Sequence, residues 1–244
     1  MKYKRVLVKL SGAALAGGDS NTTFGKGPIS HITEEMLSLA RAGVEVVLVV
    51  GGGNIFRGNL AEEWHIEKAE ADNMGMLGTI INGVLLRASL QGAGGKVRLM
   101  TALAMPSVAE PYIRLRAIRH LEKKRMIILS GGIGQPFVTT DYPSAQRAIE
   151  LECCAMLAAK NGVDGIYDSD PRTNPDAKRY RTLASDVALN RNLKVMDQSA
   201  LILARDHKLP VHVFDFDSVG AALRICQGEE VGTYVARDTA TETY

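Results

Sequence analysis

The sequence predicts an α/β fold, a three-layer α/β/α sandwich in which helices cover both faces of a mostly parallel central sheet. Short apolar runs alternate with amphipathic stretches of helical period along the whole chain. The runs are rich in β-branched residues and are bounded by Gly, Ser or Pro, which is typical of buried parallel strands. Because parallel neighbours need crossover connections, this alternation implies right-handed β-α-β units.

Length and composition limit the classes of protein that fit. The chain has 244 residues, 46% of them hydrophobic, so we expect one large domain spanning residues 1–244. The net charge is +2 with 23% charged residues, and no basic block indicates a nucleic-acid partner. No apolar run approaches eighteen residues, which argues against a membrane span. Three cysteines without disulfide or metal spacing favour the cytoplasm.

The expected elements follow from the pattern of apolar residues. Strands are predicted at residues 5–10, 45–50, 97–100, 126–129, 163–167 and 211–216. Helical stripes lie between them, at residues 32–40, 77–88, 113–121, 145–156 and 200–204. Gly43 is predicted as the C′ residue of the first helix, and Gly92 as the end of the second.

Glycine-rich loops follow several of these strands. Ligands of open α/β sheets bind beyond the carboxyl ends of the strands, so the segments after the strands are candidate site loops. They are residues 9–12, 51–53, 130–134 and 168–171. Glycine turns expose backbone N–H groups that can hold phosphate oxygens, although each loop can also be an ordinary tight turn. No GxxxxGK[ST] motif occurs, which excludes a P-loop enzyme.

Charged side chains near these loops are candidate phosphate ligands. Lys9 interrupts an apolar strand, so its ammonium must either reach solvent or meet an anion. A fixed ammonium there can stabilise the charge of a transferring phosphoryl group. Arg57 is suited to clamp a phosphate with two donors. Asp141 is either a helix-dipole carboxylate or a site residue, and Asp72 either faces solvent or binds a ligand.

In order along the chain, these motifs resemble those of the bacterial uridylate kinases, a branch of the amino acid kinase family. The matching segments are KLSG (9–12), GGGNIFRG (51–58), DNMGM (72–76), PF-x-TTD (136–141), VDGIYDSDP (163–171), NPDAKRY (174–180), LKVMD (193–197) and ARDHKLPVHVF (204–214). KLSG and GGGN are shared with aspartate and acetylglutamate kinases. FRG, DNMGM and the last two segments indicate the nucleotide branch.

The resemblance implies reversible phosphoryl transfer from ATP, bound with Mg²⁺, to UMP in pyrimidine nucleotide biosynthesis. It implies an acceptor-binding lobe of about residues 1–140 and an ATP-binding lobe of about residues 141–244, with Lys9, Arg57 and Asp141 as the catalytic residues. The implied ATP ligands are Lys9, Leu10, Ser11, Gly12, Gly53, Arg57, Asn161, Tyr167 and Asp170. The implied UMP ligands are Gly52, Asp72, Ile133, Gly134, Gln135, Pro136, Phe137, Val138, Thr139 and Thr140.

The resemblance also implies regulation and assembly. It implies a hexamer built from dimers, with UTP as feedback inhibitor and GTP as activator. The implied effector residues are Arg87, Gln91 and Arg98. No protein side chain is expected to ligate a metal directly.

Two residues of the predicted acceptor loop depart from the family pattern. Ile133 stands where a hydroxyl side chain is common, and Gln135 stands where a shorter amide is common. We nevertheless expect strict preference for UMP over CMP. Two other functions stay open from the residues alone, a kinase for a carboxylate or carbamate acceptor and a non-catalytic nucleotide sensor.

Overall fold

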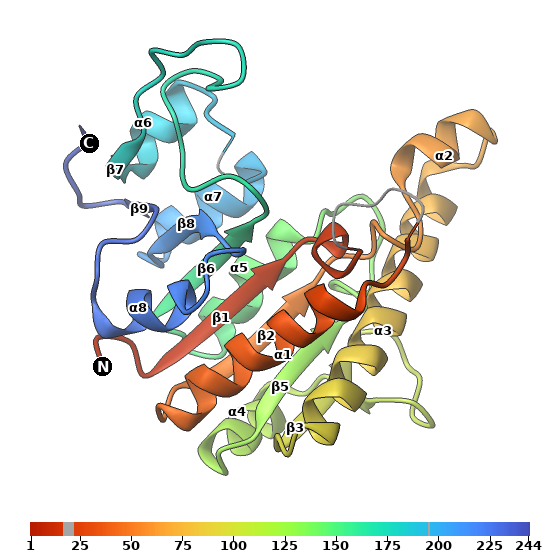
Figure 1. The fold of residues 1–244 in the computed structure, drawn as a ribbon. Helices are drawn as coiled ribbons and strands as arrows, with labels where there is room; N and C mark the ends of the chain where they lie inside the picture. Colours follow the sequence, from red (N-terminus) through yellow and green to blue (C-terminus); the bar gives the residue numbers. More distant parts are fainter. Residues whose placement is uncertain (17–21, 195) are drawn as a thin grey trace.

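The computed structural model describes residues 1–16, 22–194 and 196–244, and over these residues it confirms the α/β/α sandwich (Figure 1). The sheet has ten strands in the order β10-β7-β9-β8-β6-β1-β2-β5-β3-β4. The pairs β10–β7 and β8–β9 are antiparallel and every other neighbouring pair is parallel. Val195, inside the LKVMD segment, lies outside the described residues.

The strands are short, as buried parallel strands are. Their bounds are β1 (Arg5–Leu10), β2 (Glu45–Val50), β3 (Val97–Thr101), β4 (Glu110–Pro111), β5 (Met126–Ser130), β6 (Ala155–Lys160), β7 (Tyr180–Ala184), β8 (Val211–Asp215), β9 (Thr233–Ala236) and β10 (Glu242–Thr243).

Helices connect most of the parallel strands. They are η1 (Gly12–Leu15), α1 (Lys26–Arg41), α2 (Gly58–Glu63), α3 (Lys68–Gly92), α4 (Arg114–Glu122), α5 (Asp141–Glu150), α6 (Ser185–Asn190), α7 (Gln198–Asp206) and α8 (Ala221–Gln227). None of the helices in the described part of the chain combines the length and the hydropathy that a bilayer span requires.

Two apolar layers lie on opposite faces of the sheet because alternate residues of each strand point to opposite sides. In β1, Val6, Val8 and Leu10 join the layer beneath α1, α3 and α8, whereas Leu7 joins the layer beneath α4, α5 and α7. Figure 1 shows α1 and α3 in front of the sheet and α5 behind it. By the same alternation, Lys9 points to the α5 side at the carboxyl end of the strand.

Most of the predicted elements are confirmed, and so are two of the predicted helix ends. Gly43 follows the end of α1 with a φ of 87°, which is the left-handed conformation expected of a C′ glycine. Helix α3 ends at Gly92 as predicted. The predicted lobe boundary near residue 140 coincides with the start of α5 and stays a prediction.

The interpretation of residues 145–167 was wrong in two respects. The helical stripe at residues 145–156 ends as helix α5 at Glu150, and the strand that follows is β6, not residues 163–167. Strand β6 reads AMLAAK and has no β-branched residue, so its sequence lacks the usual strand signal. Residues 163–167 form a loop with one isolated bridge, between Tyr167 and Arg179.

Candidate active site

An ion pair between Lys9 and Asp141 marks the carboxyl edge of the sheet. Lys9 Nζ lies 2.6 Å from Asp141 Oδ1, and the two side chains are only 14% and 17% exposed. Asp141 is the first residue of α5, where the helix N-terminus favours a carboxylate. The backbone N–H of Asp197 donates to Asp141 Oδ2 at 3.1 Å and fixes the carboxylate further. The Lys9 ammonium is thus held by a carboxylate of the protein, and its contact with a phosphoryl group stays a prediction.

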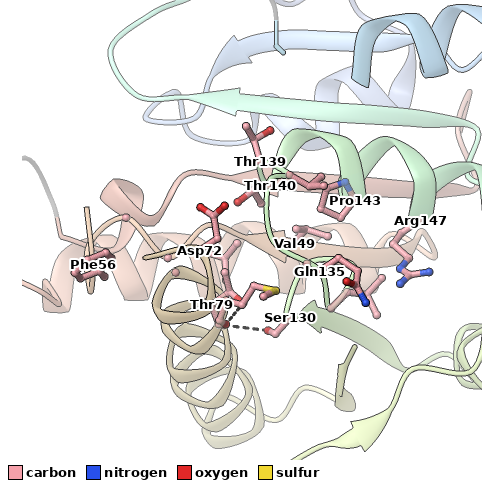
Figure 2. A pocket seen from close by; sticks show the side chains of 18 residues that line it. Val49, Phe56, Asp72, Thr79, Ser130, Gln135, Thr139, Thr140, Pro143 and Arg147 are labelled. Atoms are coloured by element: carbon pink, nitrogen blue, oxygen red, sulfur yellow. Dashed lines mark hydrogen bonds between the residues drawn. The ribbon is translucent and has the colours of Figure 1, made fainter. Parts of the chain in front are cut away.

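A cavity of about 260 Å³ opens on one side of this pair, between the β2 and β5 ends and helix α3. Figure 2 shows Asp72 on α3 near the segment that carries Thr139 and Thr140, with Phe56 and Arg147 toward opposite ends. The predicted UMP ligands that line it are Gly52, Asp72, Gln135, Val138, Thr139 and Thr140. The predicted UMP ligands Ile133, Gly134, Pro136 and Phe137 are not among the lining residues. We refer to this cavity as the acceptor cavity.

The glycines after β2 serve different purposes. A Cβ on Gly52 would collide with the carbonyl oxygen of Gly75 and lie 3.1 Å from the Thr79 nitrogen, both in α3. A Cβ on Gly53 would meet no atom of the described structure within 4 Å, and its backbone is exposed. Gly52 is thus required by the close approach of a helix, whereas Gly53 leaves open space for a ligand.

Polar contacts from α3 hold the floor of the acceptor cavity. The buried Asn82 side chain donates to the Gly51 carbonyl at 2.7 Å. Ser130 Oγ donates to the Thr79 carbonyl at 3.0 Å, a contact drawn in Figure 2. Thr79 Oγ1 accepts from the Gly131 N–H at 2.8 Å. Both glycine loops are therefore bound to one helix.

The Asp72 carboxylate also fixes the loop that follows β5. It pairs with Lys68 one turn earlier in α3, and its Oδ2 accepts from the Phe137 N–H at 2.8 Å. Phe137 has a φ of 67°, which is unusual for a bulky residue, and its ring is 70% exposed. Phe137 therefore reaches the acceptor side through its backbone, and its ring points away from the core.

A second cavity, of about 450 Å³, lies beyond the end of β6 and contains two of the predicted ATP ligands, Tyr167 and Asp170. We refer to it as the donor cavity. Its wall is the irregular segment of residues 163–172. Asp164 holds this segment by pairing with Arg179 and by accepting from the Tyr167 hydroxyl at 2.7 Å. A hydrogen bond from the Lys178 N–H is the main cause of a lowered pKa at Asp168.

The other predicted ATP ligands lie between or beside the two cavities. Ser11 Oγ donates to Asn161 Oδ1 at 3.5 Å, so the ends of β1 and β6 are in contact. Asn161 itself lines a third cavity, beside η1 and α1, rather than the donor cavity. The Leu10 side chain is fully buried in the core, which leaves only its backbone for a ligand.

Two further ATP candidates, Gly12 and Arg57, lie against the glycine loop after β2. A Cβ on Gly12 would come within 2.6 Å of the Gly53 nitrogen, so the two phosphate-loop candidates touch each other. Arg57 precedes α2 as its N-cap and donates from Nε to the Gly53 carbonyl at 3.2 Å, and it is exposed.

The three predicted effector residues are only partly brought together. Arg87 and Arg98 line one cavity near β4, and the exposed Gln91 is not among its lining residues. Arg87 donates to the Val108 carbonyl at 2.8 Å, and Arg98 Nε lies 3.5 Å from Glu110 Oε1.

Sequence reasoning missed two polar residues at this edge. Lys160 ends β6 and is followed by Asn161 and Gly162, much as Lys9 precedes Ser11 and Gly12. The alanine-rich run before Lys160 hid this signal.

The second missed residue is Asp197. It accepts from the Thr139 hydroxyl and caps α7, and these hydrogen bonds lower its pKa against the opposing effect of its burial. Asp197 is 56 residues from Asp141 in the chain, so no local sequence pattern predicts their contact.

Comparison with known proteins gives consistent matches. A model of the amino acid kinase family matches residues 4–215. The uridylate kinase of Frankia alni is 54% identical over 235 residues, covering 96% of this chain and 91% of that protein. The structure of UMP kinase from Bacillus anthracis superposes with a TM-score of 0.97 at 54% identity and covers 100% of both chains. That of UMP kinase from Ureaplasma parvum gives 0.91 at 35% identity, covering 97% of this chain and 100% of that one.

Proposed function

Because the chain belongs to the amino acid kinase family, we propose that it transfers the γ-phosphoryl group of ATP to UMP, giving UDP and ADP. The observation that carries this proposal is the Lys9–Asp141 ion pair at the end of β1, the strand that lies between β6 on the donor side and β2 on the acceptor side. A phosphoryl group in transfer needs positioning and charge stabilisation more than it needs covalent chemistry. A rigidly held ammonium between two cavities meets that need.

UMP is the proposed occupant of the acceptor cavity. The Asp72 carboxylate at its rim is suited to accept hydrogen bonds from the ribose hydroxyl groups, once it exchanges contacts with Lys68 and the Phe137 N–H. Thr139, Thr140 and Gln135 offer hydroxyl and amide groups to the base and sugar. The uridylate kinase relatives support this acceptor over a carboxylate or carbamate.

Direct in-line attack by a UMP phosphate oxygen requires no general base, because that oxygen is already ionised at neutral pH. The main barrier is repulsion between two anionic nucleotides, and the proposed offset comes from Lys9, Arg57 and the N–H groups of the glycine loops. Asp141 keeps the Lys9 ammonium in place, and Asp197 in turn keeps Asp141 in place. ATP is proposed to lie in the donor cavity along Tyr167 and Asp170.

The proposal includes a magnesium ion carried by the nucleotide. Over the described ranges, no group of three or more His, Cys, Asp or Glu side chains is arranged to hold a metal. Mg²⁺ is usually bound through substrate phosphates and one or two carboxylates, and Asp141 is the carboxylate nearest to Lys9. Bound with ATP, the ion would neutralise phosphate charge and help to align the γ-phosphoryl group.

The proposal includes a hexameric assembly, inhibition by UTP, activation by GTP and a cytoplasmic location. An exposed apolar stripe on α3 supports self-association. Its members are Met74, Leu77 and Ile81, with exposed fractions of 37%, 46% and 47%. The cavity shared by Arg87 and Arg98 supports an anionic effector site.

The test is release of ADP from ATP and Mg²⁺ with UMP, CMP or N-acetylglutamate as the acceptor. We expect turnover with UMP alone. Comparable turnover with CMP would contradict the strict preference for UMP, and turnover with N-acetylglutamate would move the assignment to the carboxylate branch. Binding of ATP or UTP without turnover of any acceptor would favour the nucleotide sensor.

A further inference from the structure

Lys160 lies on the same face of the sheet as Lys9. In the pairing of β1 with β6, Lys9 lies opposite Ala158, and Lys160 follows two residues later. Residues two apart in a strand point to the same side, so both ammonium groups project toward α5. Lys160 is displaced by about 7 Å along the strand direction, further out from the carboxyl edge.

The two lysines differ in what they contact. Lys9 is paired with Asp141 at 2.6 Å, whereas Lys160 Nζ makes no hydrogen bond or ion pair with any residue that the structure describes. Lys160 is half-buried and lines the donor cavity together with Tyr167 and Asp170. Its burial lowers the pKa of its ammonium, as does the positive charge of Lys9, and Asp141 acts in the opposite direction.

The carboxylate directly opposite Lys160 in the sheet has other partners. Asp215 lies opposite Lys160 in the pairing of β6 with β8. Its Oδ1 accepts from the N–H groups of Gly162 at 3.0 Å and Asp217 at 3.1 Å, so it fixes two turns instead of pairing with the lysine. A half-buried ammonium without a partner is costly, and an anion in the donor cavity would remove that cost.

We propose that the Lys160 ammonium binds the phosphate chain of the donor nucleotide, between the end of the cavity at Tyr167 and the phosphoryl group beside Lys9. The inference rests on the proposed function, because it takes the donor cavity as the ATP site. Lys160 then supplies a second positive charge at the ATP site, and it binds the phosphates that stay on the nucleotide. Lys9 binds the phosphoryl group that moves.

The experiment compares Lys160→Met and Lys160→Arg by calorimetric titration with ATP and Mg²⁺, adenosine and UMP. We expect Lys160→Met to raise the dissociation constant for ATP by about tenfold or more, since a charge-assisted contact is lost. The constants for adenosine and UMP stay unchanged, and Lys160→Arg restores ATP binding. Lys123→Met, at an exposed lysine after α4, is the matched control and leaves all three constants unchanged.

Three outcomes would overturn the inference. ATP affinity unchanged in Lys160→Met excludes a phosphate contact. An equal loss of affinity for ATP and for adenosine indicates that the lysine only shapes the cavity. A lower kcat in steady-state rates of the same variant, with unchanged ATP affinity, indicates that it only positions Lys9 and Asp141. Should Lys160→Met fail to fold, as judged by its thermal unfolding, Lys160→Gln provides the same comparison. Failure of the native chain to phosphorylate UMP would overturn the proposed function while leaving the binding comparison valid.

Discussion

The acceptor and donor cavities lie on either side of Lys9 and Asp141, and they are built in different ways. The acceptor cavity is bounded by strand ends and by α3, with glycine loops bound to that helix by buried hydrogen bonds. The wall of the donor cavity is largely residues 163–172, an irregular segment held by exposed side chains such as Asp164. Groups held by packed elements are positioned more rigidly than groups on loops.

Because of this difference, we expect the acceptor cavity and the donor cavity to recognise their ligands in different ways. A pre-formed acceptor cavity discriminates between similar nucleotides, because a misplaced hydrogen-bonding group is left unpaired. A cavity walled by a loop adapts to its ligand and depends more on charge than on shape. On this account, substitutions at the Lys9–Asp141 ion pair have the largest effect, those on the acceptor side have intermediate effects, and those in the donor loop have the smallest.

The largest effect is expected for Lys9→Ala, which removes the ammonium on β1, the strand between the two cavities. Loss of a pre-organised donor to transition-state charge lowers kcat by about 10²–10³-fold. Steady-state rates with UMP and ATP measure it, and the matched control is the exposed Lys123→Ala. A kcat close to that of the native chain would show that the ion pair is structural and would remove the basis of the comparison.

Gly52→Ala tests whether the acceptor cavity depends on close packing. The new methyl group collides with the Gly75 carbonyl, and overpacking of this kind lowers the free energy of unfolding by about 1–3 kcal/mol. Thermal unfolding measures the loss. Gly53→Ala is the control, because its Cβ meets no described atom within 4 Å, so its stability stays near that of the native chain. Equal stabilities of the two variants would contradict the packing argument.

Asp72→Asn tests recognition on the acceptor side without changing the size of the side chain. Hydrogen bonds to a charged group contribute about 1.5–3 kcal/mol, so the dissociation constant for UMP is expected to rise by about 10–100-fold. ATP binding stays unchanged. Glu70→Gln, an exposed substitution in the same helix turn, serves as the control. A similar increase in the dissociation constant for ATP would mean that the two cavities are not independent.

The smallest effect is expected for Asp164→Ala in the donor loop. Its pairing with Arg179 is partly exposed, and such ion pairs contribute about 0–1 kcal/mol. The KM for ATP should therefore rise by less than about fivefold, with kcat unchanged. Asp186→Ala, which removes a comparable exposed pair with Arg205, is the control. A rise in the KM for ATP of about 10–100-fold, as large as the effect expected for Asp72→Asn on UMP binding, would show that the donor loop is as rigidly built as the acceptor cavity.

The features that the sequence predicted correctly are those that short segments of the chain determine. Strand ends with small residues, the interrupted strand at Lys9 and the helix start at Asp141 are all readable from short segments. These features located the carboxyl edge of the sheet, and six of the ten UMP ligands that the family resemblance implies line the acceptor cavity. Strand β6 was missed because its alanines are suited to close packing between neighbours and give no β-branched signal.

What the sequence did not predict depends on contacts between distant segments. Gly52 was interpreted as a glycine of a ligand-binding loop, and it does line the acceptor cavity, but its lack of a side chain is also required by the close approach of α3. Gly165 likewise approaches Thr233, whose hydroxyl would lie 2.6 Å from an added Cβ. Asp197 reaches Asp141 only because α7 packs beside α5. No short pattern encodes such approaches.

A crystal structure of the chain with UMP and a non-hydrolysable ATP analogue would test the central claim most directly. The account predicts UMP in the acceptor cavity beside Asp72 and Thr140, and the adenosine of the analogue beside Tyr167 and Asp170. The two phosphate groups would then meet at Lys9. UMP in the donor cavity, or phosphates remote from Lys9, would contradict it.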